Sequence, residues 1–142
     1  MSNKFLIILH GAIGDVTRAL PLAVRIKDNL PDAHITWAIE PISKDLVLNH
    51  PAIDRVEIFD RPKGIFAYLK FIKELRKNSY DYVLDLQRHF KSGVTSYLSG
   101  GKNRLGFHRN NAKEFNWFFN NNRIPEKSNF KEEKLCFRIT NT

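Results

Sequence analysis

Gly11, Gly14 and Asp15 are the residues of this sequence best placed for chemistry, because they separate an apolar run from an amphipathic helical pattern. Two glycines allow a sharp turn and a close approach of the backbone to a bound molecule. A carboxylate beside such a turn can accept a proton from a hydroxyl nucleophile. Two structural alternatives stay open: the glycines can form an ordinary tight turn, and Asp15 can be the N-cap of the following helix.

A second group of polar residues, DLQRHFKS at 85–92, follows another apolar run. Helix N-termini bind anions, and nearby Lys and Arg side chains strengthen that binding. The alternative is a solvated helix start without a ligand. The sequence contains neither G-x-G-x-x-G nor the P-loop pattern, and it has no D-x-D pair and no Cys/His spacing typical of metal ligands. We therefore expect no cofactor and no bound metal.

Strand and helix patterns alternate along the chain, which predicts an α/β fold with a Rossmann-like parallel sheet and helices on both faces. The strand at 4–9 should lie near the centre of the sheet. Segments 11–15, Glu40 and 87–92 each follow a strand, so they should converge at the carboxyl edge.

In the helix at 65–77, the pattern predicts that Ile65, Leu69, Ile72 and Leu75 face inward, and Pro21 should open or kink the first helix. The expected strands are 4–9, 34–39, 55–59, 82–86 and 104–107, and the expected helices are 16–30, 42–49, 65–77 and 90–98.

The net charge of +8 is concentrated in the middle of the chain. Residues 61–109 contain 11 Lys and Arg against 3 Asp and Glu. Such a basic region attracts phosphate groups or anionic membrane surfaces, and the alternative is a solvated surface that keeps the protein soluble. The apolar runs are too short for a membrane span or a secretory signal, and Cys136 is the single cysteine. We therefore expect a cytoplasmic protein.

Residues 1–119 are expected to form one domain, onto which the aromatic cluster at 115–119 packs. Residues 120–142 are low in apolar content and are expected to form a linker or tail.

Several quoted segments together resemble the N-terminal half of the heptosyltransferase family of GT-B glycosyltransferases. FLIILHGAIGDVTRALPLAVRIKDNLPDAHITWAIEP is similar to the opening of that family, with its G-x-[IM]-G-D-[VI] and A-L-P motifs. NHPAIDRV, YDYVLDLQRHFKS and LSGGKNRLGF resemble later family segments and occur in the same order. The resemblance covers residues 4–109 and continues more weakly to Arg123, Ile124 and Pro125.

The resemblance implies an inverting transfer without metal between two Rossmann-like domains. The N-terminal domain would bind the acceptor, Kdo-bearing lipid A or inner-core lipopolysaccharide, and a C-terminal domain would bind ADP-heptose. The catalytic base of the family falls on Asp15. Contacts to the acceptor would fall near Gly14, Gln87, Lys91 and Ser92, with Arg61 and Lys63 as further candidates. The lipid-linked acceptor adds an expected peripheral association with the inner face of the inner membrane.

A complete family member has a second domain, which this sequence does not supply through Thr142. The expectation is an excised domain, a truncated product or one part of a split protein, with little transfer activity alone. Two other functions stay open: a module that binds phosphorylated glycans or lipids without chemistry, and a single-domain nucleotide-binding protein of flavodoxin-like form. Tight binding of ADP to this chain would favour the nucleotide-binding protein.

Overall fold

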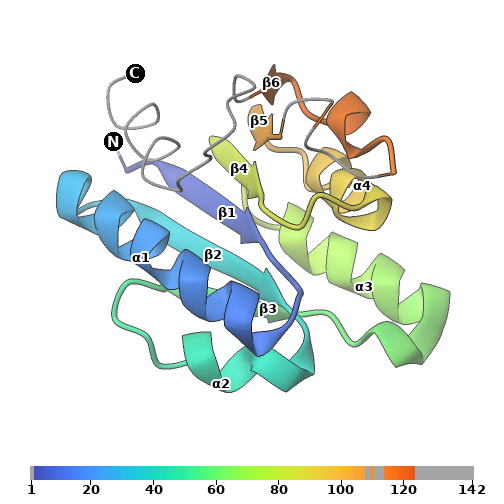
Figure 1. The fold of residues 1–142 in the computed structure, drawn as a ribbon, viewed down its shortest axis with the longest axis horizontal. Helices are drawn as coiled ribbons and strands as arrows, with labels where there is room; N and C mark the ends of the chain where they lie inside the picture. Colours follow the sequence, from blue (N-terminus) through green and yellow to red (C-terminus); the bar gives the residue numbers. More distant parts are fainter. Residues whose placement is uncertain (1, 108–109, 111–113, 124–142) are drawn as a thin grey trace.

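The computed structural model describes residues 2–107, 110 and 114–123, which form a parallel sheet between two layers of helices (Figure 1). The six strands are arranged in the order β3-β2-β1-β4-β5-β6. The strands are β1 (Lys4–Ile8), β2 (His34–Ile39), β3 (Arg55–Ile58), β4 (Tyr82–Asp85), β5 (Asn103–Gly106) and β6 (Asn122–Arg123). The helices are α1 (Ile13–Asn29), α2 (Lys44–Val47), α3 (Gly64–Arg76) and α4 (Phe90–Leu98), with short 3₁₀ helices η1 (Pro41–Ser43), η2 (Arg61–Lys63) and η3 (Asn116–Phe119).

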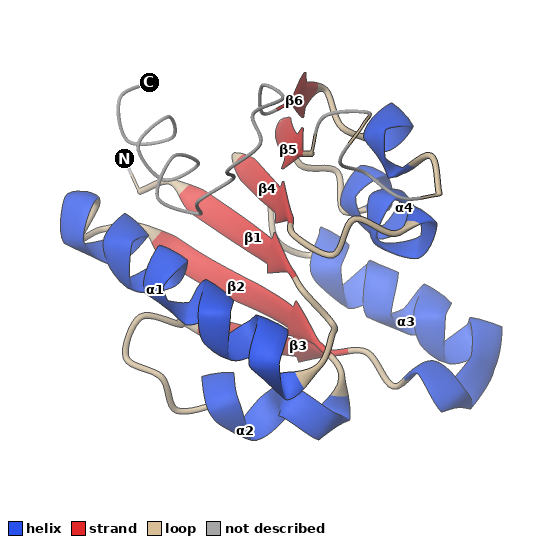
Figure 2. Ribbon diagram, in the orientation of Figure 1, coloured by secondary structure: helices blue, strands red, loops and turns tan. Residues whose placement is uncertain are grey.

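The predicted sheet and its central strand are confirmed. β1 pairs in parallel with β2 on one side and with β4 on the other. Its residues from Phe5 to Ile8 are fully buried, because helices cover both faces of the sheet (Figure 2). Phe5 and Ile7 pack with α1 and α2 on one face, and Leu6 and Ile8 pack with α3 on the other.

The strand order reverses between β1 and β4. The chain moves outward from β1 through β2 to β3, and then continues at β4 on the opposite side of β1. The loops that follow β1 and β4 therefore lie side by side at the carboxyl edge. Ligands of open α/β sheets bind at such a switch point.

The inward face of α3 differs from the prediction. Ile72 and Leu75 are buried as expected, but Ile65 and Leu69 are exposed. Phe71 and Tyr68 take the inward positions instead, and their rings pack against Phe59 at 5.2 and 5.3 Å between centroids. The large aromatic side chains fill the space next to the sheet, which turns Ile65 and Leu69 toward the outside.

Two boundaries also differ from the prediction. α1 begins at Ile13, so Pro21 lies inside the helix and does not open it. The composition predicts that the linker or tail begins at residue 120, yet Asn120 is buried and Asn122–Arg123 pair with β5 as a sixth strand. The remainder of the expected linker, 124–142, lies outside the described residues. None of the helices that the structure describes is long and apolar enough to cross a membrane.

Asp54 fixes the C-terminal half of α1 against the sheet. Its carboxylate accepts hydrogen bonds from Lys27 Nζ at 3.0 Å and from the amide of Ile35 at 2.7 Å. Partial burial raises the pKa of Asp54, but the bonds from Lys27 and Ile35 and the charge of Lys27 outweigh burial and hold that pKa below its usual value.

Asp54→Asn is expected to lower the free energy of unfolding by about 1 kcal/mol at neutral pH, because it removes a carboxylate that accepts two bonds. The folded-state pKa is depressed, so the stabilisation is present above the unfolded pKa and is lost as the pH falls through the folded value. Denaturant unfolding at several pH values measures this difference, which should shrink on acidification. Asp32→Asn, at an exposed turn, is the control and should show no such trend.

Candidate active site

Gly11 is the point at which the ends of three strands meet. Its amide donates a hydrogen bond to Gln87 Oε1 at 3.1 Å, which joins the loop after β1 to the loop after β4. Its carbonyl accepts a bond from Ser43 Oγ at 3.1 Å, in the short 3₁₀ helix that follows β2. The predicted convergence of the three segments at one edge of the sheet is confirmed.

Asp15 is the third residue of α1 and is exposed to solvent. Its interpretation as the N-cap is wrong: the cap position is Ala12, and no side chain caps the helix. The carboxylate instead extends back over the turn. A Cβ placed on Gly11 would lie 3.6 Å from Asp15 Oδ2 and 3.2 Å from Gln87 Oε1, so the carboxylate and the amide border the same glycine.

Gly14 is the second residue of α1, and apart from its chain neighbours and the nearby backbone of the helix, no atom lies within 4 Å of the position that its Cβ would occupy. Its backbone does not need glycine, because its φ is not positive. Glycine destabilises a helix interior by roughly 0.5–1 kcal/mol relative to alanine. The fold therefore gains nothing from Gly14, whereas a ligand that approaches the backbone here would require a residue without a side chain.

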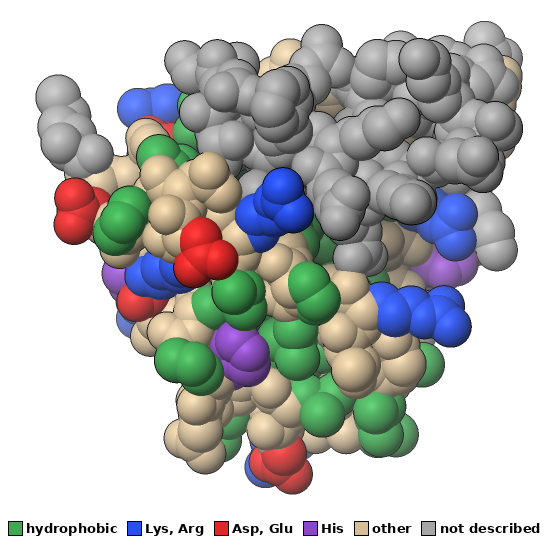
Figure 3. Space-filling model, turned by 60° about the vertical axis from the view of Figure 1, so that its left-hand side comes forward, with side chains coloured by type: hydrophobic (Ala, Val, Ile, Leu, Met, Phe, Trp, Pro, Cys, Tyr) green, Lys and Arg blue, Asp and Glu red, His purple; other side chains and the backbone are tan. Residues whose placement is uncertain are grey.

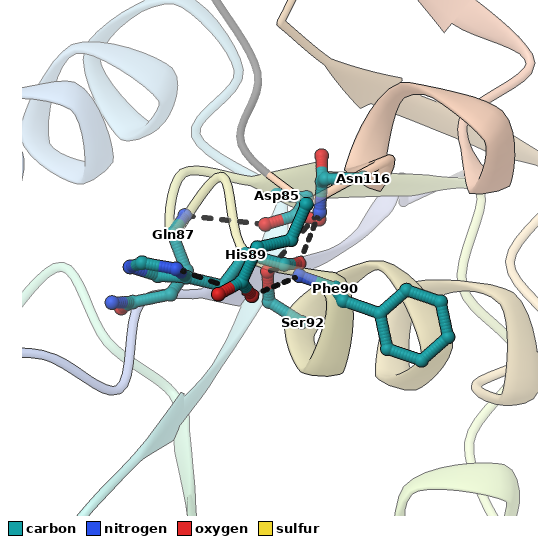
Figure 4. Close-up of polar contacts among 7 residues, drawn as sticks. Asp85, Gln87, His89, Phe90, Ser92 and Asn116 are labelled. Carbon is teal, nitrogen blue, oxygen red and sulfur yellow. Dashed lines mark hydrogen bonds and ion pairs between the residues drawn. The ribbon is translucent and has the colours of Figure 1, made fainter.

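The loop after β4 is built around Asp85, whose polar contacts are drawn in Figure 4. The Asp85 side chain is completely buried. Its Oδ2 accepts a bond from Asn116 Nδ2 at 2.5 Å, and its Oδ1 accepts one from the amide of Gln87 at 3.2 Å. Burial raises the pKa of Asp85, and the bond from Asn116 opposes part of that rise. Asp85 is therefore a structural carboxyl group that shapes the loop from below.

Asn116 ties this loop to the start of α4. The same amide nitrogen also lies 2.7 Å from the carbonyl oxygen of His89 and 3.2 Å from Ser92 Oγ (Figure 4). Arg88, which lies between Gln87 and His89 in the sequence, adopts a left-handed conformation with φ of 66°. Its guanidinium lies 5.5 Å from the ring centre of Phe107. A left-handed arginine costs energy, so tertiary contacts must hold this turn in place.

The sequence predicts that the N-terminus of α4 attracts an anion, and a carboxylate of the chain itself lies there. Glu114 Oε2 accepts a bond from the amide of Phe90 at 3.3 Å and lies 3.6 Å from His89 Nδ1. Glu114 itself has a positive φ of 50°.

The other predicted site residues belong to α4 and η2. Lys91 is exposed in the first turn of α4, whereas Ser92 is buried and donates to the carbonyl of His89 at 2.8 Å. Lys63 is exposed in η2 and forms an ion pair with Asp60 at 3.1 Å. Arg61 belongs to the same 3₁₀ helix, and its side chain lies outside the description.

The described residues contain no group of three or more His, Cys, Asp and Glu side chains that could hold a metal ion.

Toward the left of the face shown in Figure 3, acidic and basic side chains lie beside one another. A mixed surface of this kind does not attract anions as a single-sign patch does.

Sequence reasoning missed Ser43, Glu114 and Asn116, and it included Arg88 in the polar group at 85–92 without predicting its left-handed conformation. No local pattern marks Arg88, because left-handed turns usually carry Gly, Asn or Asp. Asn116 lies in an Asn-rich stretch, and only the apolar cluster around it suggested that the segment packs on the domain. Its three acceptors come from 24 to 31 residues away.

Asn116→Ala is expected to lower the free energy of unfolding by about 1–3 kcal/mol at neutral pH, because the buried Asp85 loses its side-chain donor. Without that donor the pKa of Asp85 rises further. A raised folded-state pKa removes stability as the pH rises, so the loss relative to the parent should be larger at neutral than at mildly acidic pH.

Denaturant unfolding at the two pH values measures both losses. The control is Asn29→Ala, which removes only a bond to the carbonyl of Arg25 at the exposed end of α1. An equal loss for Asn116→Ala at both pH values would show that Asn116 does not act through the ionisation of Asp85.

Comparison with known sequences gives a consistent family assignment. Residues 68–132 match the sequence model of glycosyltransferase family 9 (heptosyltransferase). The chain is 33% identical over 112 residues to lipopolysaccharide heptosyltransferase 1 of Campylobacter coli, covering 78% of this chain and 32% of that protein. It is 30% identical over 124 residues to the lipopolysaccharide core heptosyltransferase OpsX of Haemophilus influenzae, covering 87% of this chain and 35% of that protein. The chain thus spans about a third of the length of these relatives.

Solved structures share the fold. The structure of E. coli heptosyltransferase WaaC with ADP-2-deoxy-2-fluoro heptose matches with a TM-score of 0.81 at 20% identity, over 96% of this chain and 47% of that chain. A family 9 glycosyltransferase from Veillonella parvula matches with a TM-score of 0.76 at 15% identity, over 98% of this chain and 40% of that chain. Together with the sequence matches, this fold shows that the chain belongs to glycosyltransferase family 9, the heptosyltransferase family.

Proposed function

We propose that this chain forms the acceptor-binding part of a heptosyltransferase that acts on the inner core of lipopolysaccharide. The observation that carries the proposal is the position of Asp15, whose exposed carboxylate lies beside Gln87 at the switch point between β1 and β4. Because Asp15 does not cap its helix, the carboxylate is available to a bound molecule. The relatives named above are heptosyltransferases of lipopolysaccharide, which indicates the class of acceptor.

In this proposal Asp15 is the general base. As the acceptor hydroxyl oxygen bonds to the anomeric carbon, its proton moves to the Asp15 carboxylate. The bond between that carbon and the diphosphate breaks, and ADP leaves with the electron pair. Attack on the face opposite the leaving group inverts the configuration. The donor is held by a second domain, of the kind that the family resemblance implies.

The acceptor would enter over the Gly11 turn. Gly14 allows close approach to the start of α1, Gln87 fixes the turn, and Lys91 offers a cation in the first turn of α4. Ser92, which the family resemblance also suggested, is buried and would act through the shape of the loop. Arg61 and Lys63 stay predicted acceptor contacts. Because the acceptor is lipid-linked, the proposal includes peripheral association with a membrane.

Asp15→Asn tests the base. In a protein that joins this chain to the donor domain of a homologous heptosyltransferase, turnover should fall by about 10² to 10⁴, because the amide cannot take the proton. Acceptor affinity and stability should change far less, since the lost interaction belongs to the transition state. Asp28→Asn, at the exposed far end of the same helix, is the matched control. Near-normal turnover of Asp15→Asn would refute the assignment.

Gly14→Ala separates the needs of the fold from those of the ligand. The free energy of unfolding should rise by about 0.4–1 kcal/mol, because alanine favours the helix and the new methyl group meets open space. Affinity for a soluble inner-core oligosaccharide should fall by about tenfold or more, since the methyl group would occupy the path of the acceptor.

Thermal unfolding and calorimetric titration measure the two quantities for Gly14→Ala. Thr17→Ala, at an exposed position one turn further along α1, should leave acceptor affinity unchanged. A variant at Gly14 that is more stable and binds the oligosaccharide as well as the parent would contradict the position proposed for the acceptor.

A further inference from the structure

The outer side of α3 carries large apolar side chains that the core does not use. Phe66 is 84% exposed, Ile65 is 63% exposed and Leu69 is 54% exposed. The inward side of the helix is already filled by Phe71, Ile72 and Leu75, which are buried. The hydroxyl groups of Tyr68 and Thr95 lie 3.0 Å apart and link α3 to α4. The helix is therefore fixed to the domain without the three exposed residues.

Cations surround these apolar residues. Residues 63–77 contain five Lys and Arg and one acidic residue, Glu74. All five cationic residues are exposed, although Lys63 is paired with Asp60 and Lys77 with Glu74. We call this set the α3 surface; it consists of Lys63, Ile65, Phe66, Leu69, Lys70, Lys73, Arg76 and Lys77.

We propose that the α3 surface docks on an anionic lipid bilayer. Helices that lie in the membrane interface combine Phe and Leu with Lys and Arg, because apolar groups enter the acyl boundary while cations stay among the phosphates. Each Lys or Arg close to an anionic surface contributes attraction that falls off within a Debye length. Phe66 and its two apolar neighbours insert, and Lys70 and Lys73 lie at the level of the headgroups.

Protein partners fit this surface less well than lipid does. The cores of protein interfaces are depleted in lysine, whereas the α3 surface places Lys70 and Lys73 next to Phe66 and Leu69 on one helix. A second copy of the chain would bring the same cations together across a two-fold axis, where like charges repel. A lipid headgroup layer supplies the opposite charge in any orientation.

The position of the α3 surface also suits a lipid-linked substrate. α3 begins directly after η2, which follows β3 at the carboxyl edge of the sheet, and its first turns lie at the end toward which the strands point (Figure 1). The Gly11 turn lies at the same edge. The presence of a membrane near this chain rests on the proposed function. The choice of docking residues follows from the exposure and charge of α3.

The test is co-sedimentation of the chain with vesicles that contain no lipopolysaccharide, made of phosphatidylcholine alone or of phosphatidylcholine with phosphatidylglycerol. The parent should bind the anionic vesicles, and added salt should weaken that binding. Phe66→Ser should reduce the partition coefficient by about tenfold, because an inserted aromatic side chain is lost. The double variant Lys70→Glu with Lys73→Glu should reduce it by about tenfold or more, since attraction becomes repulsion.

Matched controls keep the test specific. Phe118→Ser removes an aromatic residue that is 73% exposed outside α3, and Arg18→Glu reverses an exposed charge on α1, so both should bind like the parent. Phe66→Leu should retain most of the binding. Circular dichroism should show the same fold for every variant, because all the changed residues are exposed.

Several results would overturn the inference. They are equal binding of Phe66→Ser and the parent, equal binding to neutral and anionic vesicles, or equal losses in the control variants. Self-association that Phe66→Ser abolishes, without vesicle binding, would identify a second copy as the partner instead. Titration with a soluble inner-core oligosaccharide tests the proposed function separately, since Phe66→Ser should leave that affinity unchanged.

Discussion

The hydrogen bond from the amide of Gly11 to the side chain of Gln87 joins the two strand ends between which the chain order reverses. In a doubly wound sheet, two neighbouring loops diverge at this point and leave room for a ligand. Here one glutamine side chain spans the gap and fixes the path of the turn before α1. Asp15 lies four residues after Gly11, in the first turn of α1, so the path of this turn influences where its carboxylate lies.

Gln87 depends in turn on a buried network beneath it. The Asp85 carboxyl group accepts hydrogen bonds from the amide of Gln87 and from the side chain of Asn116. The Asn116 side chain also donates to the carbonyl of His89. A buried carboxyl group with its partners satisfied specifies one arrangement of the loop, whereas a lost partner is costly. The left-handed Arg88 fits this description, because a strained turn persists only where its surroundings hold it. The segment at 114–120 therefore belongs to the machinery that shapes the site.

Much of this architecture can be predicted from the sequence, because the spacing of apolar residues indicates which positions are buried. The run Phe5–Ile8 predicts a strand covered on both faces, and the glycines after it predict the turn. The inward face of α3 could not be predicted in the same way, since Ile65 and Leu69 fit the helical period as well as Tyr68 and Phe71 do. Packing of the Tyr68 and Phe71 rings against Phe59 determines which set faces inward. This is a tertiary contact, so the local sequence pattern does not reveal it.

In the candidate site too, residues in local sequence patterns were predicted, whereas residues that act through long-range contacts were not. Asp15, Gly14 and Gln87 were found because they directly follow predicted strands or belong to recognisable motifs. Their roles toward a ligand stay predictions. Asn116 and Glu114 were missed because they act across 24 or more residues and carry no local pattern. The alternative in which Asp15 caps its helix is wrong, because α1 begins at Ile13, two residues before Asp15, and Ala12 occupies the cap position.

The most direct measurement is an NMR titration of the labelled chain with a soluble, deacylated inner-core oligosaccharide that carries Kdo, and separately with ADP. We expect the oligosaccharide to shift the amide signals of Gly11, Gly14, Gln87 and Lys91, while ADP has little effect on this chain. Tight binding of ADP at these amides, without a response to the oligosaccharide, would refute the proposed acceptor site and indicate a nucleotide-binding domain.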